Sequence, residues 1–139
     1  MQSVYYEYRR SNRKGLVMDL RESGENYLEA ILILEQRTGA VHSIDVANYL
    51  DVTKPSVSRA MGILKDANYI WMEKGGLLHL TDEGKKIAES IYERHRLLTE
   101  YLVHLGVDKE TAAQDACRIE HVISAQSFRK IKEHVAGKK

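Results

Sequence analysis

A short segment near the C-terminus carries three side chains whose types suit a divalent transition metal. Cys117, Glu120 and His121 stand at positions i, i+3 and i+4. On a helix this spacing places a thiolate, a carboxylate and an imidazole on one face, where they converge. This mixture of soft, hard and intermediate donors favours a first-row transition metal. Taken alone, the triplet also fits a small buried cysteine beside a surface Glu–His pair.

Two other segments offer further donors. His95 interrupts the apolar stripe of a predicted long helix, between Ile91 and Leu98. A histidine there needs either a hydrogen bond in the core or a metal. Glu29, with Asn26 one turn before it, lies among apolar residues, and a carboxylate near a core is costly unless it is paired or bound to a cation. Donors on three helices that face one space predict a metal site, with the candidate ligands Asn26, Glu29, His95, Cys117, Glu120 and His121.

Hydrophobic periodicity predicts a mainly α-helical chain with one β-hairpin. The first helix is expected to begin at a Ser23 N-cap and to end near Thr38, and the second to begin at a Ser43 cap and to include Leu50. The remaining elements are expected at 55–67 (helix), 69–73 and 77–80 (hairpin strands), 82–105 (helix capped by Thr81), 108–123 (helix) and 124–135 (helix).

The order helix, short helix, tight turn, helix and glycine-tipped hairpin is that of a winged helix-turn-helix. The second helix of such a pair enters the major groove with its first residues foremost. Hydroxyls and a lysine suit phosphate, and Arg59 suits a guanine edge. The candidate DNA-binding residues are Thr53, Lys54, Pro55, Ser56, Ser58 and Arg59 on the helix and Lys74 on the wing. The alternative is a three-helix domain with a solvated polar face.

The composition excludes several classes of protein. Of 139 residues, 43% are hydrophobic and 29% charged, which is globular rather than disordered. The net charge is only +1, so a DNA-binding face has to come from local clustering. The chain shows no secretory signal, one cysteine, and no apolar run near the roughly 20 residues of a membrane span. We therefore expect a cytoplasmic protein with no membrane partner.

The N-terminal segment differs from the rest of the chain. Residues 1–17 include four basic side chains, have no clear period and precede Met18. We expect a disordered basic arm, or an upstream extension of a domain that begins near Met18; contact with DNA phosphates is the functional alternative. A winged helix-turn-helix domain is expected over 18–81 and a helical domain over 82–139.

From about Gly24 to Phe128 the sequence resembles the diphtheria toxin repressor and manganese transport regulator family of bacterial metalloregulators. The resemblance rests on the segments GENYLEAIL, DVTKPSVSRAMGIL, LTDEGKKIA, ERHRLL and ACRIEHVIS. It implies a homodimer, with 82–139 as a metal-binding and dimerisation domain. It also implies a repressor of metal-uptake genes that binds palindromic operator DNA when manganese(II) or iron(II) is bound. Cobalt(II) and zinc(II) are further ions expected to bind in vitro.

Carried over by position, the resemblance makes His95, Glu120 and His121 metal ligands. Glu29 matches a ligand of the manganese-type branch, whereas Cys117 matches the iron-type branch, where manganese types have a carboxylate. Asn26 stands where manganese types have aspartate and iron types methionine. Asparagine offers only a neutral carbonyl oxygen, so whether Asn26 contacts the metal stays open at this point.

Two other classes of function are alternatives to a metal-dependent repressor. The first is a winged-helix regulator that senses a small organic ligand, with His95 and Cys117 purely structural. The second is a metalloenzyme, which would need an open metal position and a general base. The carboxylates near the metal are all needed as ligands, so the sequence offers no separate base. We therefore expect a protein that is not an enzyme.

Overall fold

The structure is a computed structural model that describes residues 20–137. Its elements are α2 (Leu20–Thr38), α3 (Ser43–Leu50), α4 (Lys54–Asp66), β1 (Ile70–Met72), β2 (Leu78–Leu80), α5 (Asp82–His104), α6 (Lys109–Ile119) and α7 (Ala125–Gly137). The predicted mainly helical fold with one hairpin is confirmed. The basic arm expected over 1–17 lies outside the described residues.

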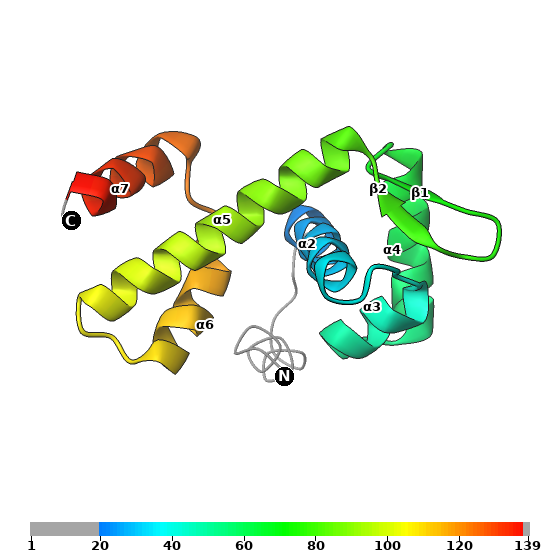
Figure 1. Ribbon diagram of the computed structural model, residues 1–139, viewed down its shortest axis with the longest axis horizontal. Coiled ribbons are helices and arrows are strands. Elements are labelled where there is room, and N and C mark those ends of the chain that lie inside the picture. The colour runs from blue at the N-terminus through cyan, green and yellow to red at the C-terminus, as the bar shows by residue number, and fades with distance from the viewer. Residues whose placement is uncertain (1–19, 138–139) are drawn as a thin grey trace.

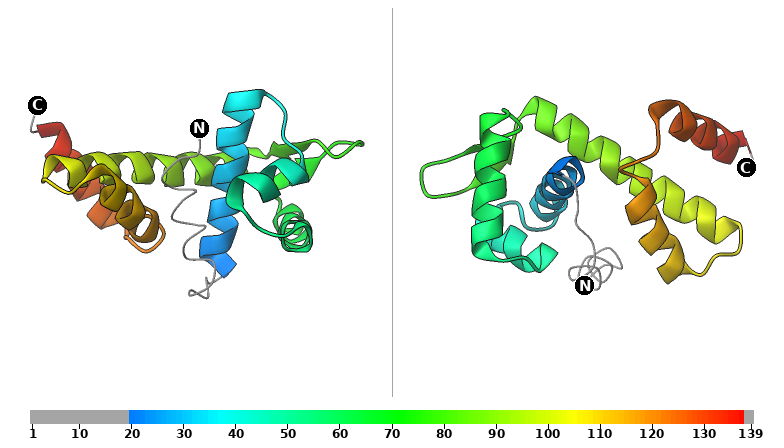
Figure 2. Two further views of the ribbon diagram at one scale, coloured as in Figure 1. Left: turned by 90° about the horizontal axis from the view of Figure 1, so that it is seen from below. Right: turned by 180° about the vertical axis from the view of Figure 1, so that it is seen from behind.

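The long helix α5 connects two groups of elements (Figure 1). At its N-terminal end α2, α3, α4 and the hairpin gather together, and α6 and α7 flank its C-terminal half; Figure 2 shows the same division from two other sides. α5 makes its most extensive contacts with α6 and α2. The helix α2 is therefore the element through which the first group meets α5.

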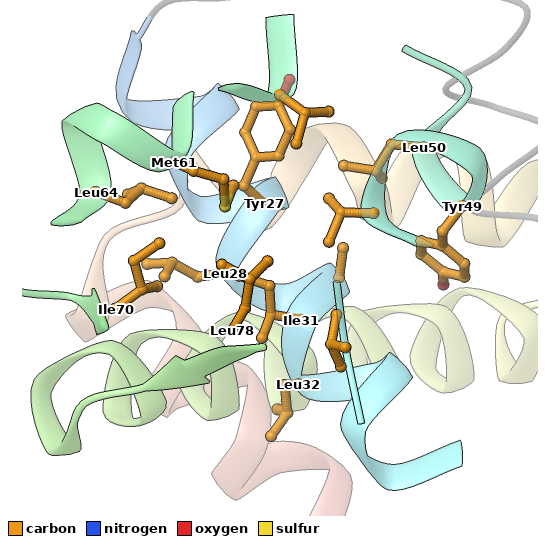
Figure 3. Packing of buried hydrophobic residues seen from close by; sticks show 14 of the residues in the cluster. Tyr27, Leu28, Ile31, Leu32, Tyr49, Leu50, Met61, Leu64, Ile70 and Leu78 are labelled. Atoms are coloured by element: carbon orange, nitrogen blue, oxygen red, sulfur yellow. The ribbon is translucent and has the colours of Figure 1, made fainter. Parts of the chain in front are cut away.

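The core of the first group is built on the apolar face of α2 (Figure 3). Tyr27, Leu28 and Ile31 of α2 are almost fully buried, and they meet apolar side chains of α3, α4 and the hairpin. The strands pair antiparallel with Trp71 opposite His79. Because successive side chains of a strand point to opposite faces, Ile70 and Leu78 lie on the other face of the hairpin, and both are buried in the core.

The junction between the hairpin and α5 is closely packed. Thr81 is the N-cap of α5, since its hydroxyl accepts a hydrogen bond from Gly84 N at 3.1 Å and donates one to Asn68 O at 2.8 Å. A Cβ added at Gly84 would overlap the carbonyl oxygen of Tyr69. Only glycine therefore permits this approach of α5 to the strand that precedes the wing.

Three expected helix ends are wrong. α2 already includes Leu20, so Ser23 lies inside the helix rather than at its N-cap. His42, not Ser43, is the N-cap of α3, where the Asp45 carboxylate accepts a hydrogen bond from His42 N at 2.8 Å. α6 ends at Ile119 instead of continuing to 123. None of the described helices has both the length and the apolar character that crossing a membrane requires.

Candidate metal centre and DNA-reading surface

Three predicted ligands meet where α5 passes the end of α6. His95 Nδ1 lies 3.0 Å from Glu120 Oε2 and 3.7 Å from Cys117 Sγ. One donor atom of each residue falls within 4.8 Å of the others, and no other group of three His, Cys, Asp or Glu residues in the described part of the chain does so. The side chain of Glu120 is fully buried and Cys117 is 2% exposed. A thiol, an imidazole and a carboxylate thus share a space from which water is largely excluded.

His121 joins this region to α2. Its Nε2 lies 3.0 Å from Asn26 Oδ1 and 3.3 Å from Glu120 Oε1, and its Nδ1 lies 2.8 Å from Glu25 Oε1. Glu120 therefore turns one carboxylate oxygen toward His95 and the other toward His121. Glu29 is buried in α2, three positions after Asn26, and it is not part of the three-residue group.

The donor set fits a bound cation. Glu120 Oε1 is buried and makes no hydrogen bond with any described residue, although His121 Nε2 is near it. A buried carboxylate oxygen without a hydrogen bond is unfavourable unless a positive charge compensates it. Sulfur, nitrogen and oxygen donors at these distances are chemically suited to a first-row transition metal.

Protonation of His121 supplies positive charge in the metal-free protein. Burial lowers the pKa of His121, but the adjacent carboxylates of Glu120 and Glu25 outweigh burial and raise the pKa to about 9. Both ring nitrogens face oxygen acceptors, which agrees with an imidazolium. A metal that binds Nε2 has to displace this proton.

Glu120 and His121 lie near other predicted ligands although one assumption about their local structure is wrong. Glu120 and His121 were expected within a helix, but α6 ends at Ile119 and Glu120 is its C-cap. The backbone of Glu120 stays in the right-handed helical region, and its N–H still donates to Ala116 O at 2.9 Å. The Glu120 side chain therefore keeps the direction that a continued helix would give it.

The predicted DNA-binding residues lie at the exposed start of α4 and on the wing. Thr53 is the N-cap of α4 and accepts a hydrogen bond from Ser56 N at 3.2 Å. The wing loop turns at Gly75 and Gly76, both with positive φ, directly after Lys74. Every predicted residue of this set is exposed: Thr53, Lys54, Pro55, Ser56, Ser58, Arg59 and Lys74.

Sequence reasoning missed two polar residues beside the centre. Glu25 reaches His121 from a position 96 residues away in the chain, and Arg94 donates hydrogen bonds into the turn after α6. Glu25 lies directly before Asn26, and Arg94 directly before His95. Adjacency to a candidate ligand was the one signal available for each.

Two models of protein families match the chain. "Iron dependent repressor, N-terminal DNA binding domain" matches residues 19–78. "Iron dependent repressor, metal binding and dimerisation domain" matches residues 81–137. The chain belongs to the iron-dependent repressor family. The resemblance to the diphtheria toxin repressor and manganese transport regulator family, drawn from the sequence, is thereby confirmed.

Relatives of this chain include proteins named as MntR transcriptional regulators. The chain is 34% identical over 108 residues to "Transcriptional regulator MntR" of Salmonella typhimurium. The matched segment covers 78% of this chain and 69% of the relative. The chain is 37% identical over 109 residues to "HTH-type transcriptional regulator MntR" of Bacillus subtilis. That matched segment covers 78% of this chain and 77% of the relative.

Solved structures of the same type share the fold. The manganese regulator SloR superimposes with a TM-score of 0.73 at 25% identity, covering 81% of this chain and 53% of SloR. ScaR with bound Zn²⁺ gives a TM-score of 0.71 at 27% identity, with the same coverage of 81% and 53%. The chain thus spans about half the length of these two proteins.

Proposed function

We propose that this protein is a metal-dependent transcriptional repressor that binds palindromic operator DNA as a homodimer. Manganese(II) or iron(II) is the proposed signal, metal-uptake genes are the proposed targets, and the cytoplasm is the proposed compartment. The protein has no proposed catalytic role. The names of the manganese regulators above support this function, since they come from members of the same family.

One observation carries the proposal: the buried donors come from both groups of elements. His95 belongs to α5, and Cys117 and Glu120 belong to the end of α6. His121 then reaches Asn26 on α2, the helix on which α3, α4 and the hairpin pack. A cation bound by residues of both groups would therefore favour one position of α2 relative to α6. Because α4 packs on α2, the cation would also favour one position of α4.

The proposed ligands are Asn26, Glu29, His95, Cys117, Glu120 and His121. A bound metal supplies concentrated positive charge that draws carboxylate, thiolate and imidazole donors together. Glu120 is central, because its two oxygens face the two imidazoles. Asn26 and Glu29 contribute from α2, and Cys117 supplies the soft donor.

The proposed DNA-binding surface is the start of α4 together with the wing. Thr53, Ser56 and Lys54 suit phosphate oxygens, and Pro55 stabilises the first turn that presents them. Arg59 and Ser58 lie farther along the exposed side, within the part of a recognition helix that reads base edges. Lys74 adds a charge at the tip of the wing.

DNA binding with and without metal tests the proposal. A fragment from the promoter region next to this protein's own gene is titrated with the full chain under anaerobic conditions. Separate titrations contain manganese(II), iron(II) or a chelator. We expect specific binding with at least one of the metals and only salt-sensitive, non-specific binding with the chelator. Equal binding in all titrations would overturn metal dependence.

A second candidate function is a regulator that senses a small organic ligand. It is favoured by a cavity of about 650 Å³ between α2, α4 and the start of α5, lined by side chains that include Leu28, Leu64 and Ile87. This volume lies within the range of small-molecule sites. Isothermal titration with manganese(II) and iron(II) separates the two functions, because only the metal-dependent repressor requires tight binding of either ion.

A further inference from the structure

Arg94 connects three elements around the candidate metal centre. It lies on α5 directly before His95, and its Nη1 donates hydrogen bonds to Glu120 O at 3.2 Å and to Ile123 O at 2.9 Å. Both acceptors belong to the turn between α6 and α7. One guanidinium group therefore attaches that turn to the helix that carries His95.

The same guanidinium also contacts α7. Its Cζ lies 5.5 Å from the centroid of the Phe128 ring, a distance at which a cation and an aromatic face attract each other. Phe128 is the buried residue of α7. α5 and α7 also meet in an edge-on contact between the Tyr101 and His134 rings, and in a bridge from Lys132 to Glu93 at 2.7 Å. The two side chains of that bridge are half exposed, so the bridge contributes little.

These contacts restrict the position of Glu120. Carbonyl groups at the end of a helix have no partner within it and need another donor. Arg94 donates a hydrogen bond to the main-chain carbonyl of Glu120. The carboxylate of the same residue lies 3.0 Å from His95 Nδ1. Because Arg94 and His95 are neighbours on a rigid helix, the hydrogen bond fixes the Glu120 backbone relative to the imidazole.

We propose that Arg94 is a positioning residue of the metal centre, which holds Glu120 opposite His95 and joins the centre to α7. It acts from outside the ligand set, through the main chain of the turn. The proposal rests on the proposed function, because it takes this centre to be a metal site. Arginine suits this task since its planar group can serve two carbonyl oxygens and an aromatic face at once.

The test compares Arg94→Lys and Arg94→Gln with the wild-type full chain. Arg96→Lys and Arg96→Gln are the matched controls: Arg96 lies two positions on in α5, is exposed, and lies over the Tyr92 ring of its own helix. Three quantities report on the metal centre and α7: the affinity for cobalt(II) by titration, the visible absorption of the cobalt-loaded protein, and amide hydrogen exchange of residues 125–137. The melting temperature of the metal-free protein reports on folding.

We expect both Arg94 variants to lose about 10- to 100-fold in cobalt affinity, the usual loss when a group that orients a ligand is removed. Their cobalt absorption spectra should also change, and exchange in α7 should become faster, whereas the Arg96 variants behave like wild type. Arg94→Lys keeps a positive charge and removes the Nε–H, which is buried and has no hydrogen-bond partner in the described residues. Its melting temperature should therefore fall less than that of Arg94→Gln, which keeps the test valid if Arg94→Gln folds poorly.

Two results would overturn the proposal. Wild-type cobalt affinity and an unchanged spectrum in Arg94→Lys would show that Arg94 does not position Glu120, even if exchange in α7 changes. A changed cobalt spectrum with unchanged amide exchange in α7 would contradict the part of the proposal in which Arg94 joins the centre to α7. Absence of cobalt binding in the wild-type protein would instead contradict the proposed function itself, and the positioning role with it.

Discussion

Cys117 and Asn26 are the residues expected to set which metal the proposed site prefers. Cys117 is a buried thiol 3.7 Å from His95 Nδ1, and Asn26 Oδ1 lies 3.0 Å from His121 Nε2. A thiolate favours softer and more strongly bound ions, and a neutral amide lowers the affinity for a hard cation such as manganese. We therefore expect both residues to shift the preference of the site away from manganese, toward iron(II), cobalt or zinc.

The first prediction follows from these two residues. Cys117→Glu combined with Asn26→Asp should shift the order of metal affinities, and of metals that activate DNA binding, toward manganese. Cobalt bound to the wild-type protein should show thiolate-to-metal charge-transfer absorption, which the double variant lacks. Competitive titration and visible spectroscopy measure both effects. If the wild-type protein shows no such band and the variant keeps the same order of metals, Cys117 packs as a small apolar side chain and is not a ligand.

At the residue scale, the sequence identifies polar residues that interrupt an apolar pattern as candidate site residues. It does not identify the residues that those side chains contact. His95 and Glu29 could be found because each interrupts a run of apolar positions, and both have little exposed surface. Glu25 and Arg94 follow no such pattern, since charged residues at the edge of an amphipathic helix usually face solvent. Their contacts depend on how α2 and the turn after α6 meet α5, which is tertiary information.

At the scale of the elements, the order of helices and strands was predictable and some helix ends were not. The hairpin, the Thr81 cap and the helix that begins at Lys54 agree with sequence patterns within about two residues. The cap of α3 was misassigned because serine is a preferred N-cap, whereas here His42 has the extended backbone of the cap and Asp45 closes it. Such ends depend on local backbone geometry more than on residue preference.

The second prediction concerns α4. Arg59→Ala should weaken specific operator binding by about 1–3 kcal/mol, the usual value of one good base contact, while metal affinity and dimerisation stay nearly unchanged. Lys65→Ala is the matched control, because Lys65 is an exposed base in the last turn of the same helix. Fluorescence anisotropy with labelled operator measures both variants. Wild-type affinity in Arg59→Ala would show that α4 does not read this operator through Arg59.

The third prediction concerns the junction of the wing with α5. Gly84→Ala should destabilise the protein by about 1–3 kcal/mol, because the added methyl group would overlap a backbone carbonyl that cannot move away easily. The control is Gly62→Ala in α4, where nothing lies within 4 Å of the added Cβ. That change should be neutral or stabilising by up to about 1 kcal/mol. Urea denaturation of both variants gives the free energies of unfolding; equal stability of Gly84→Ala and wild type would refute the close packing.

At the scale of the whole molecule, α5 and α2 together connect the two proposed sites. The donors cluster where the middle of α5 meets the end of α6, and His121 contacts α2 beside them. α2 in turn packs against α3, α4 and α5. A cation and an operator that both favour the same placement of α2 would be coupled thermodynamically, without direct contact between them.

The affinity for metal in the presence and absence of operator DNA tests this coupling most directly. Iron(II), manganese(II) or cobalt(II) is titrated into the full chain alone and into the chain saturated with operator, at the same pH and salt concentration. Linkage requires that the operator raise metal affinity by the same factor by which that metal raises operator affinity. We predict a factor of about 5 to 150, the usual range of such coupling. Equal metal affinities in the two titrations would contradict a metal-dependent repressor.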